Sequence, residues 1–321
     1  MSDYNVLHGL KVKYLSGDPS NPEDGQVWYN SSSNTLKVAE VTSASAAGSW
    51  ASGGAVGTAR TTCSAGTQTA NVIMGGQGPT SNVEEYNGSS WSEVNNMPYV
   101  ASNLGGTGTQ TAAIAMGGYY NVSTSAEYDG TNWTVGGSLN TGREFGSGGV
   151  GIQTAALAIG GYIREPGATN KVEQYNGSSW SVAPILNTAL YGRAGSGTTS
   201  AALAGGGQSG SQSTATEEYD GSSWTTVNAR PFASGSAMAS GTQTAALNYG
   251  GNPGGAVTTT ASYDGTNWSA EPAMATARSM GGGSPAGTTS AALASTGSPG
   301  GTATEEFTVP VSTGVKTLAS S

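Results

Sequence analysis

The stretch GTQTANVIMGG at residues 66–76 decides the fold, because similar stretches recur along the chain. Each copy starts with glycine and continues through threonine and small apolar residues, and the first five copies end on a Gly-Gly pair. The copies occupy residues 66–76, 108–118, 151–161, 197–207, 241–251 and, in a weaker form, 287–297. Such internal repeats indicate a repetitive architecture.

A second motif follows each of the first five copies and ends on a tryptophan, as in EYNGSSW at residues 85–91. These tryptophans are Trp91, Trp133, Trp180, Trp224 and Trp268. The aromatic residue before the turn recurs every 42–47 residues, at Tyr86, Tyr128, Tyr175, Tyr219, Tyr263 and Phe307. This spacing is typical of a four-stranded blade of a β-propeller.

Each repeat predicts four strands in a fixed order. The Gly- and Ser-rich segment is the expected innermost strand and the TAALA-type segment the second; VEEY (residues 83–86) is the third and SWSEV (residues 90–94) the outermost. Small side chains suit the centre, where blades converge, and Trp and Tyr fill the wider periphery. Asn-Gly or Asp-Gly between the third and fourth strands accepts the positive φ of a tight hairpin turn.

Trp50 predicts how the repeats close. It lies 41 residues before Trp91, while the sixth repeat stops at Phe307 without a tryptophan strand of its own. We therefore expect the strand around Trp50 to complete the last blade and to remove free sheet edges. The predicted fold class is all-β, a six-bladed propeller with four-stranded blades over residues 48–308, closed by this N-terminal strand.

The repeats over residues 48–308 resemble kelch repeats. The resemblance rests on the Gly-Gly pair, the later Glu and Tyr, the Trp of the next strand, and Met97-Pro98 or Met274 ahead of Arg278. The arginine of the motif shifts in position, and the second repeat has none. The arginines are Arg60, Arg143, Arg193, Arg230 and Arg278. We interpret them as residues that cap strands and pair with acidic neighbours.

Residues 1–47 do not repeat and predict an N-terminal arm. The segment from residue 17 to residue 39 reads as a turn, a strand and its return, which makes a short β-hairpin. An isolated two-stranded hairpin is marginally stable. We therefore expect the arm to dock onto another protein through Trp28 and Tyr29; a simple cap on the propeller base is the alternative.

Residues 309–321 are expected to form a C-terminal tail. Pro310 disfavours a central strand in this segment. The tail is expected either to compete with the Trp50 strand for the same sheet edge or to lie across the propeller base.

The segment PEDGQVWYN at residues 22–30 resembles a motif of structural and tail-fibre proteins of tailed bacteriophages. The GTQTAAL-type repeats resemble kelch-like repeats of marine phage virion proteins. The resemblance implies a virion component, not an enzyme, that is assembled in the host cytoplasm. It also implies an oligomeric state in the virion and contacts with other virion proteins through residues 1–47.

Composition restricts the partners and the compartment. The chain has 52 Gly among 321 residues and only 10% charged residues, which is unfavourable for helices. Its formal charge of −9 argues against nucleic acid, since phosphate binding requires a basic surface. We expect no membrane span, because no run of eighteen apolar residues occurs, and no signal peptide, because the start lacks a basic and an apolar region.

The sequence offers no expected catalytic residue, metal site or cofactor. His8 is the only histidine and Cys63 the only cysteine, which excludes the usual zinc and copper ligand sets. Paired glutamates recur at residues 84–85, 217–218 and 305–306. Because they occupy one position in several repeats, we interpret them as packing residues and not as a pair of catalytic acids.

The loops that follow the Gly-Gly pairs differ most between repeats and are expected to share one face. Tyr119, Tyr120, Tyr162 and Arg164 place aromatic rings and charge there, which suits stacking on sugars or contact with protein. Ordinary variable surface loops are the alternative. The leading hypothesis is a virion protein for assembly or adhesion to a host-surface glycan or protein; a glycan-binding propeller and a polysaccharide depolymerase are the alternatives.

Overall fold

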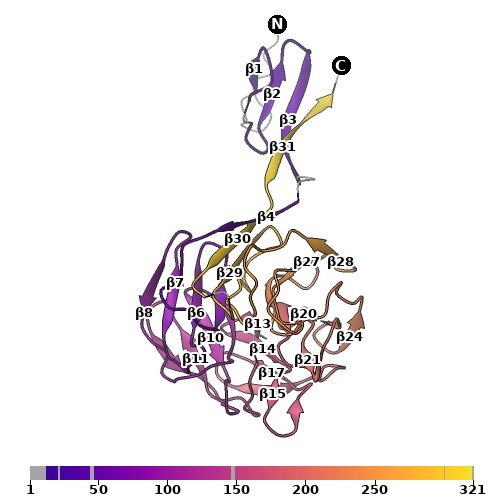
Figure 1. The fold of residues 1–321 in the computed structure, drawn as a ribbon. Helices are drawn as coiled ribbons and strands as arrows, with labels where there is room; N and C mark the ends of the chain where they lie inside the picture. The colour runs from indigo at the N-terminus through magenta and orange to yellow at the C-terminus, as the bar shows by residue number, and fades with distance from the viewer. Residues whose placement is uncertain (1–11, 21, 44–46, 146–148, 300, 320–321) are drawn as a thin grey trace. The chain divides into compact units, whose positions relative to one another are not determined.

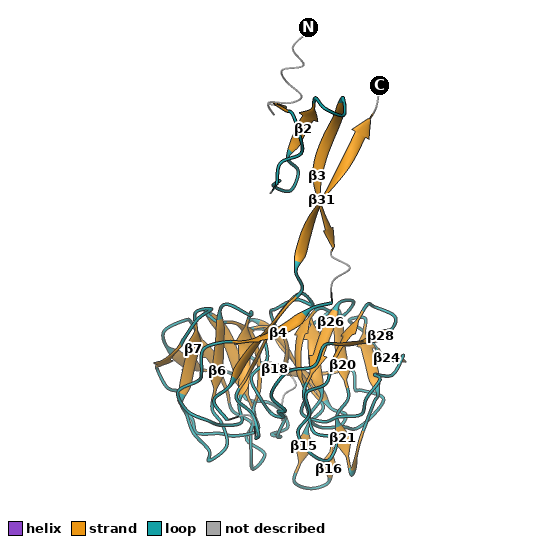
Figure 2. Ribbon diagram, turned by 45° about the horizontal axis from the view of Figure 1, so that its top comes forward, coloured by secondary structure: helices purple, strands orange, loops and turns teal. Residues whose placement is uncertain are grey.

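The computed structural model describes residues 12–20, 22–43, 47–145, 149–299 and 301–319. These residues form strands, turns and loops without any helix (Figure 2). The described part of the chain accordingly contains no helix with the length and apolar character needed to cross a membrane. Contacts divide the chain into the arm unit, Met1–Ala47 with Val309–Ser321, and the repeat unit, Gly48–Thr308.

The repeat unit contains a succession of antiparallel four-stranded sheets. The first contains β5 (Cys63–Gly66), β6 (Asn71–Met74), β7 (Val83–Tyr86) and β8 (Trp91–Val94). The second contains β9 (Gly105–Thr109), β10 (Ala112–Met116), β11 (Ser125–Tyr128) and β12 (Trp133–Val135). The third contains β13 (Gly149–Ile152), β14 (Ala155–Ile159), β17 (Val172–Tyr175) and β18 (Trp180–Ala183).

Two further four-stranded sheets follow. The fourth contains β19 (Ala194–Gly197), β20 (Ala202–Gly205), β23 (Thr216–Tyr219) and β24 (Trp224–Val227). The fifth contains β25 (Met238–Gly241), β26 (Ala246–Tyr249), β27 (Thr260–Tyr263) and β28 (Trp268–Glu271). In each sheet the strands pair in chain order, which confirms the predicted succession within a repeat.

Glycine at the first turn of each sheet is required by geometry. Gly66 has φ +109°, and a Cβ there would lie 2.2 Å from the carbonyl oxygen of Ala70. At the turn after β7, Asn87 Oδ1 accepts hydrogen bonds from the backbone N–H groups of Ser89 and Ser90 at 3.0 and 2.9 Å. These local requirements explain why both turn motifs return in the sequence.

The last sheet joins the two ends of the repeat unit. It contains β29 (Ala291–Ser295), β30 (Thr304–Thr308) and β4 (Ser49–Ser52), and Trp50 lies opposite Phe307 as the repeat count predicts. Four strands were expected here, but the described residues show three. The inner segment makes only isolated bridges, including Gly282 with Ser295, because Pro285 has no N–H and the neighbouring glycines disfavour a regular strand.

The sheets surround a common centre, an arrangement consistent with a β-propeller (Figure 1). Backbone N–H groups next to the inner strands donate to carbonyls of the neighbouring sheet. These bonds are Phe145 to Asn103 (2.9 Å), Gly192 to Phe145 (2.9 Å), Ser236 to Gly192 (2.7 Å), Met280 to Ser236 (3.0 Å) and Thr62 to Met280 (3.0 Å). The last bond joins the first and last sheets.

Small residues allow the inner strands to approach closely. Gly106, Gly149, Gly195 and Ala239 are among the residues that line a central cavity of about 40 Å³. A cavity of this size suits a few water molecules. The described inner strands are therefore closely packed around this cavity.

Each tryptophan of the repeat links its own sheet to the preceding one. The indole of Trp91 packs against the Tyr86 ring in a tilted arrangement with ring centroids 4.9 Å apart, and its Nε1 donates to Thr304 Oγ1 at 3.0 Å. Trp50 behaves alike, since its Nε1 donates to Thr260 Oγ1 at 3.2 Å and to the Pro272 carbonyl at 3.1 Å. The other Nε1 acceptors are Asn95 O for Trp133, Ser125 Oγ for Trp180, Pro184 O for Trp224 and Thr216 Oγ1 for Trp268.

Buried ion pairs confirm the structural interpretation of most of the repeat arginines. The pairs are Arg60–Glu84, Arg143–Glu173, Arg193–Glu217 and Arg278–Glu305, with nitrogen–oxygen distances of 2.5–2.6 Å in all but the second pair. Burial raises the pKa of Glu173, but the hydrogen bonds from Arg143 and Asn140 and the charge of Arg143 together outweigh it, so the pKa is lowered. Alanine replaces the glutamate in the second and fifth sheets, at Ala126 and Ala261.

The arm unit is a four-stranded sheet and not only a hairpin. Its strands are β1 (Lys13–Leu15), β2 (Val27–Asn30), β3 (Thr35–Ser43) and β31 (Val311–Ala319), in the order β1-β2-β3-β31. β2 and β3 form the predicted hairpin, and β1 adds to it in parallel.

The C-terminal tail corrects a prediction. The expectation for residues 309–321 was a tail that competes with the Trp50 strand or crosses the propeller base, but β31 pairs along β3 in the arm sheet. Pro310 precedes β31 and so removes no N–H from its ladder, and β31 lies at the edge of the sheet, where a strand beside proline is tolerated.

Candidate functional site

The variable loops gather at one end of the sheets of the repeat unit. Because neighbouring strands are antiparallel, the second strand ends where the first and third begin. The loops after the Gly-Gly pairs and the segments before the inner strands therefore meet on one surface, here called the loop face. Its variable loops are residues 77–82, 119–123, 162–170, 208–214 and 252–258.

Two loops of this face contain short hairpins that the repeat pattern did not predict. β15 (Tyr162–Ile163) pairs with β16 (Gly167–Ala168), and β21 (Gln208–Ser209) pairs with β22 (Ser211–Gln212). Two-residue strands have too little sequence to show a period, so no alternation could reveal them.

Tyr119, Tyr120 and Arg164 form a cluster on the loop face. The two tyrosine rings meet edge to face with centroids 4.4 Å apart. The Arg164 guanidinium carbon lies 3.8 Å from the Tyr120 ring centroid, and Nη2 donates to the Tyr119 hydroxyl at 3.1 Å. Tyr120 is 65% exposed, so the cluster is accessible to solvent.

The backbone of this cluster is held in an unusual conformation. Tyr120 and Asn121 have φ of +66° and +58°, the left-handed region that is rare for bulky residues. Asn121 Oδ1 accepts the backbone N–H of Arg164 at 3.1 Å, and Glu144 Oε1 accepts that of Tyr120 at 3.4 Å. These bonds hold the loop in place, and such strain commonly accompanies binding surfaces.

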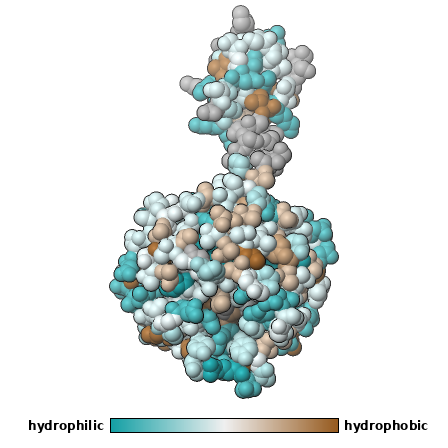
Figure 3. Space-filling model, in the orientation of Figure 1, coloured by the Kyte–Doolittle hydropathy of each residue, from teal (hydrophilic) through white to brown (hydrophobic). Residues whose placement is uncertain are grey.

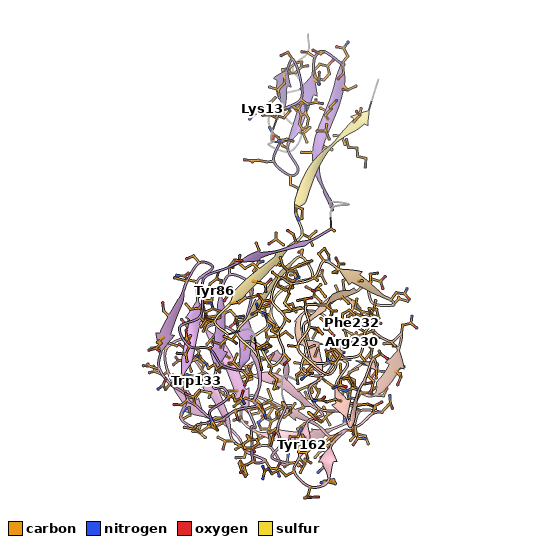
Figure 4. The ribbon with its side chains drawn as sticks, in the orientation of Figure 1. Lys13, Tyr86, Trp133, Tyr162, Arg230 and Phe232 are labelled. Atoms are coloured by element: carbon orange, nitrogen blue, oxygen red, sulfur yellow. The ribbon has the colours of Figure 1, made fainter. Side chains whose placement is uncertain are left out.

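A pocket of about 320 Å³ lies beside the cluster. We call it the loop-face pocket; it is lined by Asn103, Glu144, Phe145, Tyr162, Tyr191, Gln208, Ser236 and Met280. Tyr162, labelled in Figure 4, meets Tyr191 edge to face with ring centroids 5.2 Å apart. The volume is at the lower end of the range of about 300–1,000 Å³ that is usual for small-ligand sites.

Backbone bridges fix the walls of the pocket. Glu144 and Tyr162 exchange two hydrogen bonds of 2.9 and 2.7 Å, and Tyr191 and Gln208 exchange two of 3.1 and 2.9 Å. Each bridge joins a segment before an inner strand to a segment after a Gly-Gly pair. These bridges therefore anchor Tyr162 and Gln208, which lie in loops, to the segments before the inner strands.

Glu144 connects the pocket to the cluster. Its Oε2 accepts a hydrogen bond from Asn103 Nδ2 at 3.1 Å, while its Oε1 accepts the Tyr120 N–H. Among the described residues that line the pocket, Glu144 is the only charged one. The pKa of Tyr191 is raised by burial and by the proximity of Tyr162 and Glu144, so its hydroxyl remains a hydrogen-bond donor at neutral pH.

One face of the repeat unit is mainly polar. On the face that Figure 3 shows, the repeat unit carries mostly hydrophilic and neutral residues, and strongly hydrophobic ones are scattered. Scattered apolar residues are normal for a protein surface. The loop-face pocket is distinguished by its aromatic wall residues, which are Phe145, Tyr162 and Tyr191.

The four residues predicted to bind a ligand fall into two groups on the loop face. Tyr119, Tyr120 and Arg164 form the cluster, and Tyr162 lies in the pocket. Sequence reasoning missed other residues of the pocket walls, namely Asn103, Glu144, Tyr191 and Gln208. Three of them, Asn103, Glu144 and Tyr191, lie just before inner strands, and the available signal was that the residues beside the motif arginine position differ between repeats.

Trp28 of the arm is not available for direct docking. Its side chain is fully buried, and its Nε1 donates to Asp18 Oδ1 at 3.0 Å. Tyr29 is partly exposed and lies next to Tyr14, which is 67% exposed, with ring centroids 4.8 Å apart. Trp28 thus stabilises the arm sheet, and a docking role remains a prediction for Tyr29.

Within the described residues, no group of three or more His, Cys, Asp or Glu side chains is arranged to hold a metal ion. Cys63 is buried, and burial raises the pKa of its thiol to about 12. Neither feature adds a reactive centre to the pocket.

No protein-family model matches the chain, and no curated protein matches it.

Proposed function

We propose that the chain is a non-enzymatic virion component of a tailed bacteriophage. Its repeat unit would be a six-bladed kelch-like propeller, closed by β4, that presents the loop-face pocket for adhesion to a host-surface glycan. The observation that carries the adhesion proposal is the pocket with two tyrosines, one carboxylate and two amide side chains.

Closure is supported by contacts that recur at the junction of the first and last sheets. Gln110 Nε2, in the turn between β9 and β10, donates to the carbonyls of Asn71 and Tyr86 at 3.1 and 2.8 Å. Gln68 makes the equivalent bonds to Ala292 and Phe307 at 3.3 and 2.7 Å. A junction built like the others is what a closed ring of equivalent blades requires.

A second contact recurs in the same way. The hydroxyl of Tyr128 donates to Glu85 Oε1 at 2.9 Å, and that of Tyr86 donates to Glu306 Oε1 at 2.6 Å across the junction. Where glutamine replaces the acceptor, at Gln174, the tyrosine of the next sheet donates to the Gly221 carbonyl instead. The paired glutamates therefore act in blade packing, as their repetition predicts.

The virion location rests on the resemblance of residues 22–30 to tail-fibre and structural proteins of phages. The arm sheet is compatible with that role, because it is a folded unit with exposed aromatic surface at Tyr14. We propose that the arm unit contacts other virion proteins and that the assembled protein is oligomeric.

Binding is proposed in preference to hydrolysis for a chemical reason. Glycosidases use two carboxyl groups about 5–9.5 Å apart on either side of the scissile bond. Among the described residues lining the pocket there is one carboxylate, Glu144. A depolymerase would therefore need a second acid from outside the pocket walls.

The test uses purified particles and the free protein. Antibody against the repeat unit should label the particles in electron micrographs, and free protein should reduce adsorption of the particles to their host. Particles without the protein would contradict the virion assignment. Release of reducing ends from host polysaccharide, abolished in Glu144→Gln, would instead show a depolymerase.

A further inference from the structure

We infer that the loop-face pocket binds a neutral pyranose with adjacent hydroxyl groups, which rests against Tyr162 and Tyr191 and is held by Glu144, Asn103 and Gln208. The inference deepens the adhesion role and rests on that proposed function for its biological setting. Binding of the sugar to the pocket can be tested on the isolated protein, independently of that setting.

The two kinds of wall match the two kinds of surface on a pyranose. Tyr162 and Tyr191 are half-buried and supply aromatic carbon and hydroxyl groups together. A pyranose has C–H groups that pack on aromatic rings and hydroxyls that require both donors and acceptors. A pocket with an apolar wall and few polar groups is the usual form of a small-ligand site.

The polar groups are suited to vicinal hydroxyls. The Glu144 carboxylate offers two oxygens and uses only part of its capacity on Asn103 Nδ2 and the Tyr120 N–H. Gln208 Oε1 accepts from Gln212 Nε2 at 3.1 Å, which orients its amide nitrogen as a donor. Planar carboxylate and amide groups can take two neighbouring hydroxyls at once, and the carboxylate bond is the stronger one.

Charge favours a neutral ligand over an anion. Glu144 is the charged group of the described pocket walls, and the chain as a whole has a formal charge of −9. A carboxylated or phosphorylated sugar would bring like charge next to Glu144 in a partly buried site. Such a ligand should be repelled.

Charge also argues against an organic cation. The Glu144 carboxylate already accepts two hydrogen bonds, and Arg164 lies close enough for its own pKa to be raised by the tyrosines and by Glu144 despite the opposing effect of burial. A quaternary ammonium ligand is usually bound by a cage of aromatic rings without a competing cation nearby. Arg164 therefore offsets part of the attraction that Glu144 would exert on a cation.

The test is binding of simple probes to the full chain. Methyl glycosides of glucose, mannose and galactose are the neutral probes, with N-acetylneuraminic acid and choline as charged comparisons, followed by calorimetry and saturation-transfer NMR. We expect at least one neutral glycoside to bind, and neither charged probe to bind more tightly. No neutral glycoside binding at tens of millimolar, or preferential binding of choline or the acid, would overturn the inference.

The variants locate the site. Glu144→Gln keeps the shape and removes the charge, and it should weaken the sugar about tenfold or more. Tyr191→Ala should weaken it at least tenfold, while Tyr162→Phe should change it less than about threefold if ring packing dominates. The matched control is Tyr14→Ala, which removes an exposed tyrosine of the arm and should leave affinity unchanged.

The outcomes separate this inference from the proposed function. Equal affinity of the wild type, Glu144→Gln and Tyr191→Ala would place the sugar elsewhere and overturn the inference. The near-isosteric Glu144→Gln keeps the test valid if Tyr191→Ala does not fold. A protein that binds sugar but is absent from particles would sink only the virion proposal, whereas a particle component that binds no neutral sugar would sink only the pocket inference.

Discussion

Arg230 differs from the other buried arginines of the repeat unit in having no carboxylate partner among the described residues. Its Nη2 donates to the Ser234 carbonyl at 2.8 Å and its Nη1 to Asn248 Oδ1 at 3.4 Å, while Ala261 stands where other sheets have glutamate. Burial, with a further effect of Arg193, lowers the pKa of Arg230 to about 10. Figure 4 shows Arg230 beside Phe232, and its guanidinium carbon lies 5.9 Å from that ring centroid.

This difference predicts that replacing arginine with methionine costs much more stability at position 143 than at position 230. Arg143→Met leaves Glu173 buried and unpaired, so we expect a loss of about 3–5 kcal/mol in the free energy of unfolding. Arg230→Met removes a buried charge that has only neutral partners, so we expect a change within about 1 kcal/mol. Urea unfolding of both variants measures this, and equal losses would contradict the distinction.

Asp18 predicts a pH dependence within the arm. Hydrogen bonds from Lys37, Asn30 and Trp28 lower the pKa of Asp18 from its ordinary 3.8 to about 2. Because the folded pKa is depressed, these contacts are complete above pH 3.8 and are lost only as the pH falls through about 2. The indole N–H resonance of Trp28 should therefore stay unchanged from about pH 5 to about pH 3. Titration near pH 4 would show that the contacts do not form, and Asp18→Asn is the control that should not titrate.

Single residues differ in how far the sequence could predict their roles. The tryptophans and the arginine pairs recur, so their structural roles follow from repetition. Glu144 and Tyr191 do not recur in the repeats. Their position in one pocket depends on the backbone bonds of Glu144 with Tyr162 and of Tyr191 with Gln208. A single sequence contains no signal for such a non-repeating contact between distant segments.

At the scale of elements, glutamines in the first turns join neighbouring sheets. Gln68, Gln110, Gln153 and Gln243 each donate to two backbone carbonyls of the preceding sheet. Threonine occupies the equivalent turn position in the fourth sheet, at Thr199, and ahead of β29, at Thr289. Some junctions between neighbouring sheets of the repeat unit thus have the glutamine hydrogen bonds, and others have threonine in that position.

Installing the missing glutamine should stabilise the protein. Thr199→Gln would meet the carbonyls of Ala156 and Tyr175, the register partners in the third sheet. We expect a gain of about 0.5–1.5 kcal/mol in the free energy of unfolding, the usual net value of a hydrogen bond. Gln110→Ala should lose about 1–3 kcal/mol, because it leaves carbonyls without their donor. Urea unfolding measures both, and a destabilised Thr199→Gln would show that the turns are not equivalent.

The order of strands within a sheet followed from the sequence because its causes are local: turn glycines, alternating segments and bulky outer residues. The tail strand β31 was missed because its partner β3 lies far away in sequence. The sequence of residues 311–319 does not indicate which free sheet edge the strand joins. Only the structure shows that it pairs with β3.

At the scale of the whole molecule, β4 should be needed for the integrity of the repeat unit, whereas the arm should not. A fragment of residues 48–308 keeps β4 paired with β30 and should remain folded and soluble. A fragment of residues 53–308 lacks Trp50 and exposes the edge of β30, so we expect aggregation or a large fall in melting temperature. Indistinguishable melting curves for the two fragments would contradict this role of β4.

Because the walls of the loop-face pocket come from several sheets, we expect the pocket to depend on closure of the ring by β4. Ser49 and Thr308 are exposed and directly opposite each other in β4 and β30. Opposed residues of this kind meet the distance requirement of a disulfide. The buried Cys63 should not interfere.

The most direct measurement is therefore oxidation of the Ser49→Cys/Thr308→Cys variant, followed by mass spectrometry of its proteolytic peptides. We expect an intrachain disulfide between the two positions, and none in the control Ser49→Cys/Ser181→Cys, where Ser181 lies in β18 of another sheet. A variant that stays reduced, or that links only between molecules, would contradict closure of the propeller by its N-terminal strand.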